Sequence, residues 1–211
     1  MKGPRVPGKT PSAVDAAHCR VPAGTAIDIH AHPLCADPGT AAAMRRLAPQ
    51  CGIGHVVLLS DVMAHSFYPR SAEIRRINDT TICTVRQDPG FFTGFCHLNP
   101  AHPRRFLRAE IDRCAAAGLR GIKLEVSVNA RDRRLDPIME RAAALGWPVL
   151  HHAWYKTGGN LPDESTPAGI AHLAGRFPRA VIIMAHLSGC GVRGIHDIRP
   201  HPNISIDTSG G

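Results

Sequence analysis

Two histidines separated by one residue, His30 and His32, lie in an apolar segment that has the character of a β-strand. Because side chains alternate along a strand, we expect Asp28 to share a face with both histidines and Ile27 and Ile29 to face the other way. Two imidazoles on one face can bind a divalent metal at about 2.0–2.1 Å, and Asp28 is a candidate to orient one imidazole by a hydrogen bond. Taken alone, this pair is equally consistent with two histidines at a strand end that bind no metal. The metal hypothesis therefore requires further ligands that lie close to these two.

Two later apolar segments end in further histidines. Only one of His151 and His152 can face the same side as the first pair, and we predict that His152 does so while His151 is buried or faces the helices. On the segment that ends in His186, we expect Ile182 and Met184 to share the inward face with that histidine. Convergence of these histidines predicts a metal site.

Two charged residues on another segment are candidates for a second metal ion or for substrate contacts. Lys123 and Glu125 are two residues apart and are expected to share one strand face. An ion pair between these two side chains is an equally good interpretation. A further carboxylate, Asp207, ends the last apolar segment.

The elements that must position these residues alternate regularly along the chain. Seven apolar segments are separated by stretches that have helix caps and apolar stripes. The intervals between successive segment starts are close to the roughly 30 residues of a βα unit. Strands alternating with helices imply a parallel sheet covered by helices. The segments are 26–32, 55–61, 93–98, 121–126, 148–153, 180–186 and 203–207.

A TIM-type (β/α) barrel accounts better for this pattern than an open doubly wound sheet. The first strand is not followed by the glycine-rich phosphate motif of nucleotide-binding sheets. The candidate residues instead gather at carboxyl ends of strands, where barrel enzymes build their sites. We predict an α/β fold with a barrel over residues 25–211, preceded by a flexible extension over residues 1–24.

Composition narrows the class of protein. The 211 residues are 44% hydrophobic and 20% charged, which is ordinary for a globular domain. There is no apolar run of about 20 residues to cross a bilayer, and residues 1–24 lack the apolar centre of a secretory signal. The seven cysteines form no Cys-x-x-Cys pair and predict neither disulfides nor a thiolate zinc site. These features predict a cytoplasmic location.

The formal charge of +8 raises the question of nucleic-acid binding. Aromatic residues make up only 5% of the chain, and no helix-turn-helix pattern is present. We therefore expect solvated basic faces and a small-molecule substrate, with neither nucleic acid nor membrane as a partner. A homo-oligomer is compatible with the sequence.

The ordered set of motifs resembles the amidohydrolase superfamily, specifically its amidohydrolase-2 branch of metal-dependent hydrolases. The resemblance implies that His30 and His32 bind the first metal and that His152 binds the same ion or a second one. It implies that His186 is the catalytic residue that orients water or the substrate carbonyl, or is a ligand in two-metal members. Lys123 lies where some two-metal relatives carry a carboxylated lysine. The matching stretches are 27–33, 94–100, 118–124, 148–152 and 185–189.

One departure from the family pattern concerns its eighth strand. The family places a catalytic aspartate at the end of that strand, whereas this sequence ends at Gly211 soon after the seventh, to which Asp207 belongs. We therefore expect a barrel truncated after the seventh strand, with the edges of the first and seventh strands unpaired.

The resemblance implies a hydrolase of a small amide, lactone or ester that uses metal-activated water, with zinc favoured and manganese or iron also suitable, as one or two ions. A decarboxylase of the same family is the main alternative. A TatD-like deoxyribonuclease, with Glu125 as a ligand, and a degenerate chain without activity are the others. Loop residues expected near the site are Trp154, Tyr155, Lys156, His65, Phe67 and Tyr68.

Overall fold

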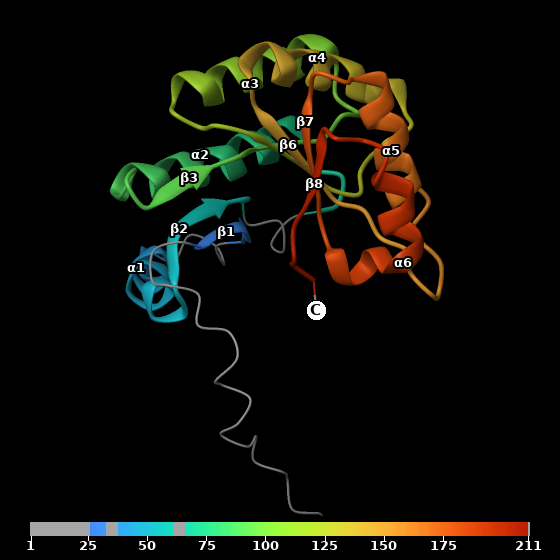
Figure 1. The fold of residues 1–211 in the computed structure, drawn as a ribbon. Coiled ribbons are helices and arrows are strands. Elements are labelled where there is room, and N and C mark those ends of the chain that lie inside the picture. The colour runs from blue at the N-terminus through green and yellow to red at the C-terminus, as the bar shows by residue number, and fades with distance from the viewer. Residues whose placement is uncertain (1–25, 33–37, 61–65, 211) are drawn as a thin grey trace, which may run out of the picture.

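The computed structural model describes residues 26–32, 38–60 and 66–210 (Figure 1). The predicted extension 1–24 lies outside them. The strands are β1 (Ala26–Ala31), β2 (Ile53–Leu58), β3 (Phe92–Gly94), β4 (Cys96–Leu98), β5 (Ile122–Leu124), β6 (Pro148–His151), β7 (Val181–Met184) and β8 (Ile204–Ile206). The helices are α1 (Pro38–Leu47), α2 (Ser71–Gln87), α3 (Arg104–Ala116), α4 (Asp136–Leu145), α5 (Pro167–Arg176) and α6 (Leu187–Ile198), with short 3-10 turns at Ala48–Cys51 and Arg133–Leu135.

All described strand pairs are parallel, in the orders β1-β2-β3 and β4-β5-β6-β7-β8. The predicted third strand is divided at Phe95 into β3 and β4. The Phe95 N–H donates to the Leu58 carbonyl on one side, and the Cys96 N–H donates to the Gly121 carbonyl on the other. The chain therefore leaves β2 and joins β5 at this point, and the seven predicted strands follow one curved sheet.

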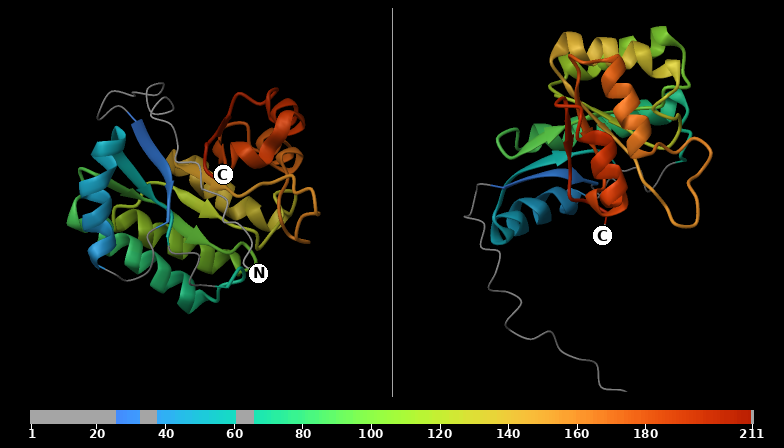
Figure 2. Two further views of the ribbon diagram at one scale, coloured as in Figure 1. Left: turned by 90° about the horizontal axis from the view of Figure 1, so that it is seen from below. Right: turned by 45° about the vertical axis from the view of Figure 1, so that its right-hand side comes forward.

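The helices cover the outer side of this sheet, as predicted (Figure 2, left). Helix α5 shows why. Its N-cap Thr166 accepts a hydrogen bond from the Gly169 N–H, and Pro167 occupies the first turn, where its missing N–H costs nothing. Its buried stripe contains Ile170 and Leu173, which belong to the large core between helices and strands. Periodic apolar residues and helix caps thus place the outer layer of a (β/α) barrel.

A smaller core lies inside the curve of the sheet. Its buried members all come from strands or from the residues that directly follow them, and Ile29 packs against it. It forms a floor beneath the carboxyl ends of the strands, where the candidate residues lie. Its members are Val57, Leu59, Phe95, Leu150, Ile183 and Ala185.

Two of the predicted strand faces are wrong. Ile183 belongs to the inner core, whereas Ile182 and Met184 pack with the helices, the reverse of the prediction. Ile29 packs against the inner core although it was expected to face outward. The register between β1 and β2 shifts between Asp28 and Ala31, so simple alternation is interrupted within β1.

The sheet is not closed into a complete barrel. In the part of the chain that the structure describes, β1 and β8 form no ladder with each other. A groove of about 430 Å³ separates them, and the side chains of His30 and Asp207 make contact across it. The groove is lined by Ile27, Asp28, Ile29, His30, Ile53, Ile206, Asp207, Thr208 and Ser209.

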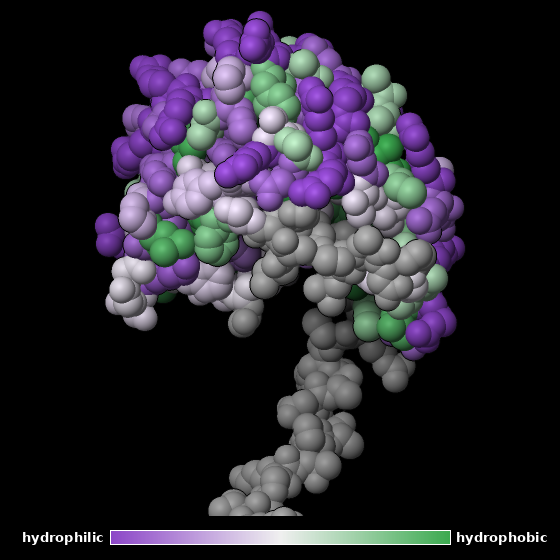
Figure 3. Space-filling model, turned by 180° about the vertical axis from the view of Figure 1, so that it is seen from behind, coloured by the Kyte–Doolittle hydropathy of each residue, from purple (hydrophilic) through white to green (hydrophobic). Residues whose placement is uncertain are grey.

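The outer surface is mainly hydrophilic where α3 and α4 cover the sheet, at the top of the view from behind (Figure 3). Ion pairs join these two helices, Arg104 with Glu140 at 2.7 Å and Arg141 with Asp112 at 2.6 Å. Exposed pairs of this kind contribute little to stability. Among the described residues, no helix has both the length and the apolarity to cross a bilayer.

Replacing Gly121 with alanine tests the packing of the inner core. The new Cβ would lie 2.5–2.7 Å from three ring carbons of the buried Phe95. We expect the free energy of unfolding to fall by about 1–3 kcal/mol, the usual cost of overpacking, as measured by urea denaturation. Gly158→Ala is the matched control, because its Cβ would meet no atom within 4 Å. Equal stabilities of the two variants would contradict the packing described here.

Candidate active site

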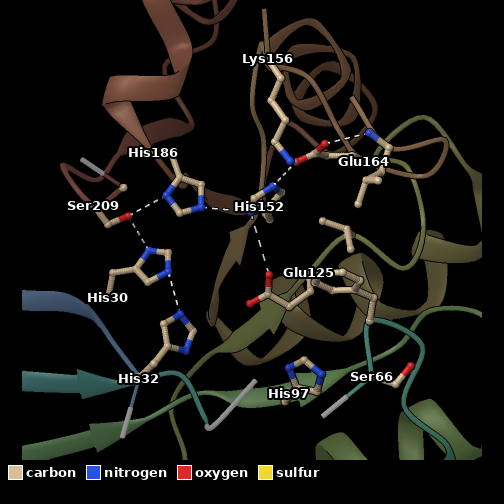
Figure 4. Close-up of a pocket in the computed structure, with 14 residues that line it drawn as sticks. His30, His32, Ser66, His97, Glu125, His152, Lys156, Glu164, His186 and Ser209 are labelled. Carbon is tan, nitrogen blue, oxygen red and sulfur yellow. Dashed lines mark hydrogen bonds and ion pairs between the residues drawn. The ribbon is translucent and has the colours of Figure 1, made fainter. Parts of the chain in front are cut away.

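His30 on β1 and His32, which directly follows this strand, bring two ring nitrogens together. The Nε2 atoms of His30 and His32 lie 3.1 Å apart (Figure 4). Each ring is held at its other nitrogen. His32 Nδ1 donates to the Ser60 carbonyl at 2.8 Å, and His30 Nδ1 donates to Asp207 Oδ2 at 2.6 Å. Both Nε2 atoms therefore present lone pairs to the same space.

Asp207 takes the orienting role that the sequence assigned to Asp28. The Asp28 carboxylate instead accepts a hydrogen bond from the backbone N–H of His30, so that prediction is wrong. Burial favours the neutral form of Asp207, but hydrogen bonds from His30, Ser209 and the His186 backbone outweigh it and hold the pKa of this carboxyl well below its usual range. The ionised carboxylate fixes the His30 tautomer with its proton on Nδ1.

A second facing pair joins His152 and His186. Their Nδ1 and Nε2 atoms, respectively, lie 3.0 Å apart. His152 Nε2 donates to Glu164 Oε1 at 2.7 Å. The Ser209 hydroxyl donates to Asp207 and accepts from His186 Nδ1 at 3.0 Å. The two facing nitrogens therefore also carry lone pairs.

The backbone conformation of His186 explains how it reaches the pocket. Its φ of 75° lies in the left-handed region, which is uncommon for residues other than glycine. Its N–H donates to Asp207 Oδ1 at 2.9 Å. This turn follows β7 directly, so His186 enters the site although Ile182 and Met184 face the helices. Burial is the main cause that lowers the pKa of His186 to about 4, and burial also lowers the pKa of His152 and His32.

Lys123 and Glu125 form the ion pair that the sequence offered as one interpretation. The Lys123 side chain is fully buried, and its Nζ lies 3.2 Å from Glu125 Oε1. Burial opposes ionisation of Glu125, but Lys123 and the neighbouring histidines lower its pKa to about 2. Lys123 Nζ also lies 3.4 Å from His30 Nε2, and Glu125 Oε2 lies 4.0 Å from His152 Nδ1.

The four histidines and Glu125 line a pocket of about 470 Å³ at the carboxyl ends of the strands. One part of its wall is apolar and includes Phe67, Val126 and Leu161. The polar part contains all four predicted histidines and Glu125. The complete lining is His30, His32, Ser66, Phe67, His97, Glu125, Val126, His152, Lys156, Leu161, Glu164, His186, Ser209 and Gly210.

The loop residues predicted near the site divide into several groups. Phe67 and Lys156 line the pocket, and the Trp154 ring packs against His186 at 4.8 Å between centroids. Tyr155 and Tyr68 instead donate to Asp197 and Asp163, respectively. The remaining one, His65, lies outside the described residues.

The donor set fits a divalent metal ion. Two Nε2 lone pairs 3.1 Å apart repel each other unless a cation lies between them, and this separation allows both to bond one ion at about 2.0–2.1 Å. Both rings have their Nδ1 positions fixed by oxygen acceptors, as metal-binding histidines usually do. His30, His186 and Asp207 form a further group whose ligand atoms lie within 4.8 Å of one another.

Sequence reasoning missed four contributors to the site. His97 is the middle residue of β4 and is buried in the pocket wall, and a histidine within this apolar segment was a usable signal. Glu164 lies in an irregular loop and Ser209 follows β8, and neither has a periodic pattern around it. The Ser60 carbonyl is a backbone group that no side-chain pattern reveals. His151, as predicted, is fully buried and does not line the pocket.

Solved structures with a similar fold include TIM-barrel enzymes and relatives. An uncharacterised TIM-barrel protein from Bordetella bronchiseptica is 19% identical over 80% of this chain, with a TM-score of 0.64. A putative amidohydrolase from Staphylococcus aureus is 16% identical over 87% of this chain, with a TM-score of 0.68. A 2,6-dihydroxybenzoate decarboxylase from Rhizobium is 16% identical over 90%, with a TM-score of 0.63.

The chain spans 59% of the Bordetella protein, 79% of the Staphylococcus protein and 81% of the Rhizobium protein. No curated protein matches its sequence. The Amidohydrolase family model Amidohydro_2 matches residues 27–211, which include every described candidate residue. The sequence, the parallel (β/α) architecture and this match establish that the chain belongs to the Amidohydrolase family.

Proposed function

We propose that the chain is a metal-dependent hydrolase of a small amide, lactone or ester and that His30, His32 and His152 bind the metal, with zinc favoured. One observation carries the proposal. Four imidazoles are each held at one nitrogen by an outer partner, and their other nitrogens face one another in two pairs at 3.1 and 3.0 Å.

A proton between the facing nitrogens is disfavoured. The pKa values of His32, His152 and His186 are all lowered, chiefly by burial, so these rings are neutral at pH 7. A bound metal cation would relieve the repulsion between facing lone pairs. Imidazole donors suit zinc, although manganese and iron also accept them. One ion bound by His30, His32 and His152 would leave His186 Nε2 free to accept a proton, whereas a second ion would make His186 a ligand.

A bound divalent metal supplies Lewis-acid polarisation of a substrate carbonyl and lowers the pKa of bound water to about 7. The chain's own residues provide the rest. His186 Nε2 faces the pocket and can accept a proton, while Ser209 and Asp207 hold its ring and backbone. The apolar wall formed by Phe67, Val126 and Leu161 excludes water from the body of a small substrate.

A carbon–carbon lyase that releases CO₂ is the second candidate. The same apolar wall, with Lys156 at its edge, could hold a carboxylated ring, and a decarboxylase is among the structures with a similar fold. Zinc-loaded protein should be tested with small amides, lactones, esters and carboxylated aromatic compounds, recording acid and CO₂ release separately. Acid release supports hydrolysis, and CO₂ release without hydrolysis supports the lyase. Metal-dependent cleavage of DNA would instead revive the nuclease alternative.

His186→Asn tests the catalytic assignment. Loss of a positioned proton acceptor should reduce kcat by about 10²–10⁴-fold, while zinc content stays at the wild-type level if His186 is not a ligand. His172→Asn is the control, because His172 is exposed on α5. An unchanged kcat on the best substrate of the panel would refute the assignment.

The cytoplasmic location and a homo-oligomeric state stay predictions from the sequence.

A further inference from the structure

The loop that joins β6 to α5 carries a buried carboxylate, Glu164, with 2% of its surface exposed. Its Oε1 atom accepts hydrogen bonds from His152 Nε2 at 2.7 Å and from Lys156 Nζ at 2.8 Å. Its Oε2 atom accepts a hydrogen bond from the Leu161 N–H at 3.0 Å. Figure 4 shows Glu164 and Lys156 on the side of His152 away from His186.

The backbone around Glu164 is fixed from two directions. Its N–H donates to the Leu161 carbonyl at 3.0 Å, and its carbonyl accepts from Asn129 Nδ2 at 3.0 Å. The next residue, Ser165, accepts a hydrogen bond from the Ala130 N–H at 2.9 Å. The loop is thereby attached to the segment that follows β5, so Glu164 has a defined place relative to the sheet.

This geometry determines which nitrogen of His152 enters the pocket with a lone pair. An ionised carboxylate accepts hydrogen bonds, so the Nε2 atom beside it must carry the proton. The Nδ1 atom, 3.0 Å from His186 Nε2, is then free of a proton. The opposite tautomer would place the Nε2 lone pair 2.7 Å from a carboxylate oxygen, which is repulsive.

We propose that Glu164 is a positioning residue that fixes the tautomer and ring orientation of His152, so that Nδ1 is the nitrogen offered to the metal. This inference rests on the metal site proposed above and adds the loop 154–166 to it. Lys156 balances the charge of the buried carboxylate, and because its side chain is 41% exposed, the pair extends from the pocket to solvent. The sequence motifs contain neither residue of this pair.

The first experiment uses the metal-free wild-type protein and does not depend on metal binding. Long-range ¹H–¹⁵N correlation spectra at pH 8 report which nitrogen of each histidine carries the proton, and the His152 signals are identified by their loss in His152→Gln. We expect His152 to be protonated on Nε2. In Glu164→Gln the amide oxygen still accepts a hydrogen bond, and the tautomer should persist. In Glu164→Leu no acceptor remains, and the preference for Nε2 should be lost.

The second experiment titrates the same proteins with Zn²⁺ against a chromophoric chelator. Loss of an outer partner of a metal-binding histidine typically costs 10–100-fold in affinity, and we expect that loss in Glu164→Leu and a smaller one in Glu164→Gln. Glu140→Gln is the matched control, because Glu140 is 45% exposed on α4 and contacts only arginines among its described ion-pair partners.

Two results would overturn the positioning role. One is a wild-type His152 protonated on Nδ1, which needs no variant to fold. The other is a folded Glu164→Leu protein that keeps both the wild-type tautomer and the wild-type zinc affinity, as a purely structural role for Glu164 would allow. A wild-type protein that binds no zinc would overturn the metal site itself, while the tautomer measurement would still decide the role of Glu164.

Discussion

His30→Ala should remove stoichiometric metal from the purified protein. The substitution deletes one of two Nε2 donors 3.1 Å apart and leaves His32, which directly follows β1, as the single imidazole at the end of this strand. It also removes one of the hydrogen-bond donors to Asp207, whose carboxylate contacts His30 Nδ1 at 2.6 Å. We expect zinc per chain, measured by elemental analysis after dialysis, to fall to background, and zinc affinity to fall by at least about 100-fold, as expected from the loss of a direct ligand.

The control must lose a histidine without losing the site. His172→Ala serves this purpose because the residue is exposed on α5 and does not line the pocket. Circular dichroism of both variants establishes that the fold is retained. If His30→Ala binds zinc with wild-type stoichiometry and affinity, β1 does not hold the ion and the proposed function fails.

The metal-free protein should lose stability as the pH falls from about 6.5 to 4. Burial lowers the pKa of His151 from 6.5 to about 4, so the unfolded chain binds more protons than the folded one within this window. The neutral His151 ring therefore makes its full contribution to the free energy of unfolding above pH 6.5, and this contribution is lost as the pH falls towards 4. A difference of about 2.5 in pKa corresponds to about 3 kcal/mol.

The physical cause lies in the surroundings of His151. Its ring is fully buried, its Nδ1 donates to the His152 carbonyl at 2.9 Å, and its Nε2 has no hydrogen-bond partner among the described residues. Protonation would bury a charge without an acceptor. Urea unfolding at pH 7 and pH 4 measures the loss, and His151→Leu should show a smaller one. Equal losses in the two proteins would contradict the assignment to His151, since His186 titrates in the same direction in both.

Much of the fold could be predicted because its signals are periodic. The seven strands and the apolar stripes of α3 and α5 follow from the spacing of residues such as Leu107, Ile111 and Ile170, which are buried as expected. The choice of His152 over His151 for the pocket also followed from alternation along one strand.

The errors arose where the backbone departs from regular geometry. A register shift within β1 brings Ile29 against the inner core, and a left-handed φ brings His186 into the pocket after β7. Neither feature has a residue such as glycine to indicate it. The partners Asp207 and Glu164 were also misassigned or missed, because they lie 177 and 12 residues along the chain from the histidines they contact. Tertiary structure alone brings such pairs together.

The seam between β1 and β8 has a consequence for motion. Elsewhere neighbouring strands are joined by main-chain ladders, which do not depend on protonation or ligation. At this seam, the described contacts are hydrogen bonds that involve side chains. They join the Asp207 carboxylate and the Ser209 hydroxyl to His30 and His186. A cation bound by the histidine pairs would therefore also stabilise the contact between β1 and β8. Separation of these two strands and binding of the cation are then expected to be thermodynamically coupled.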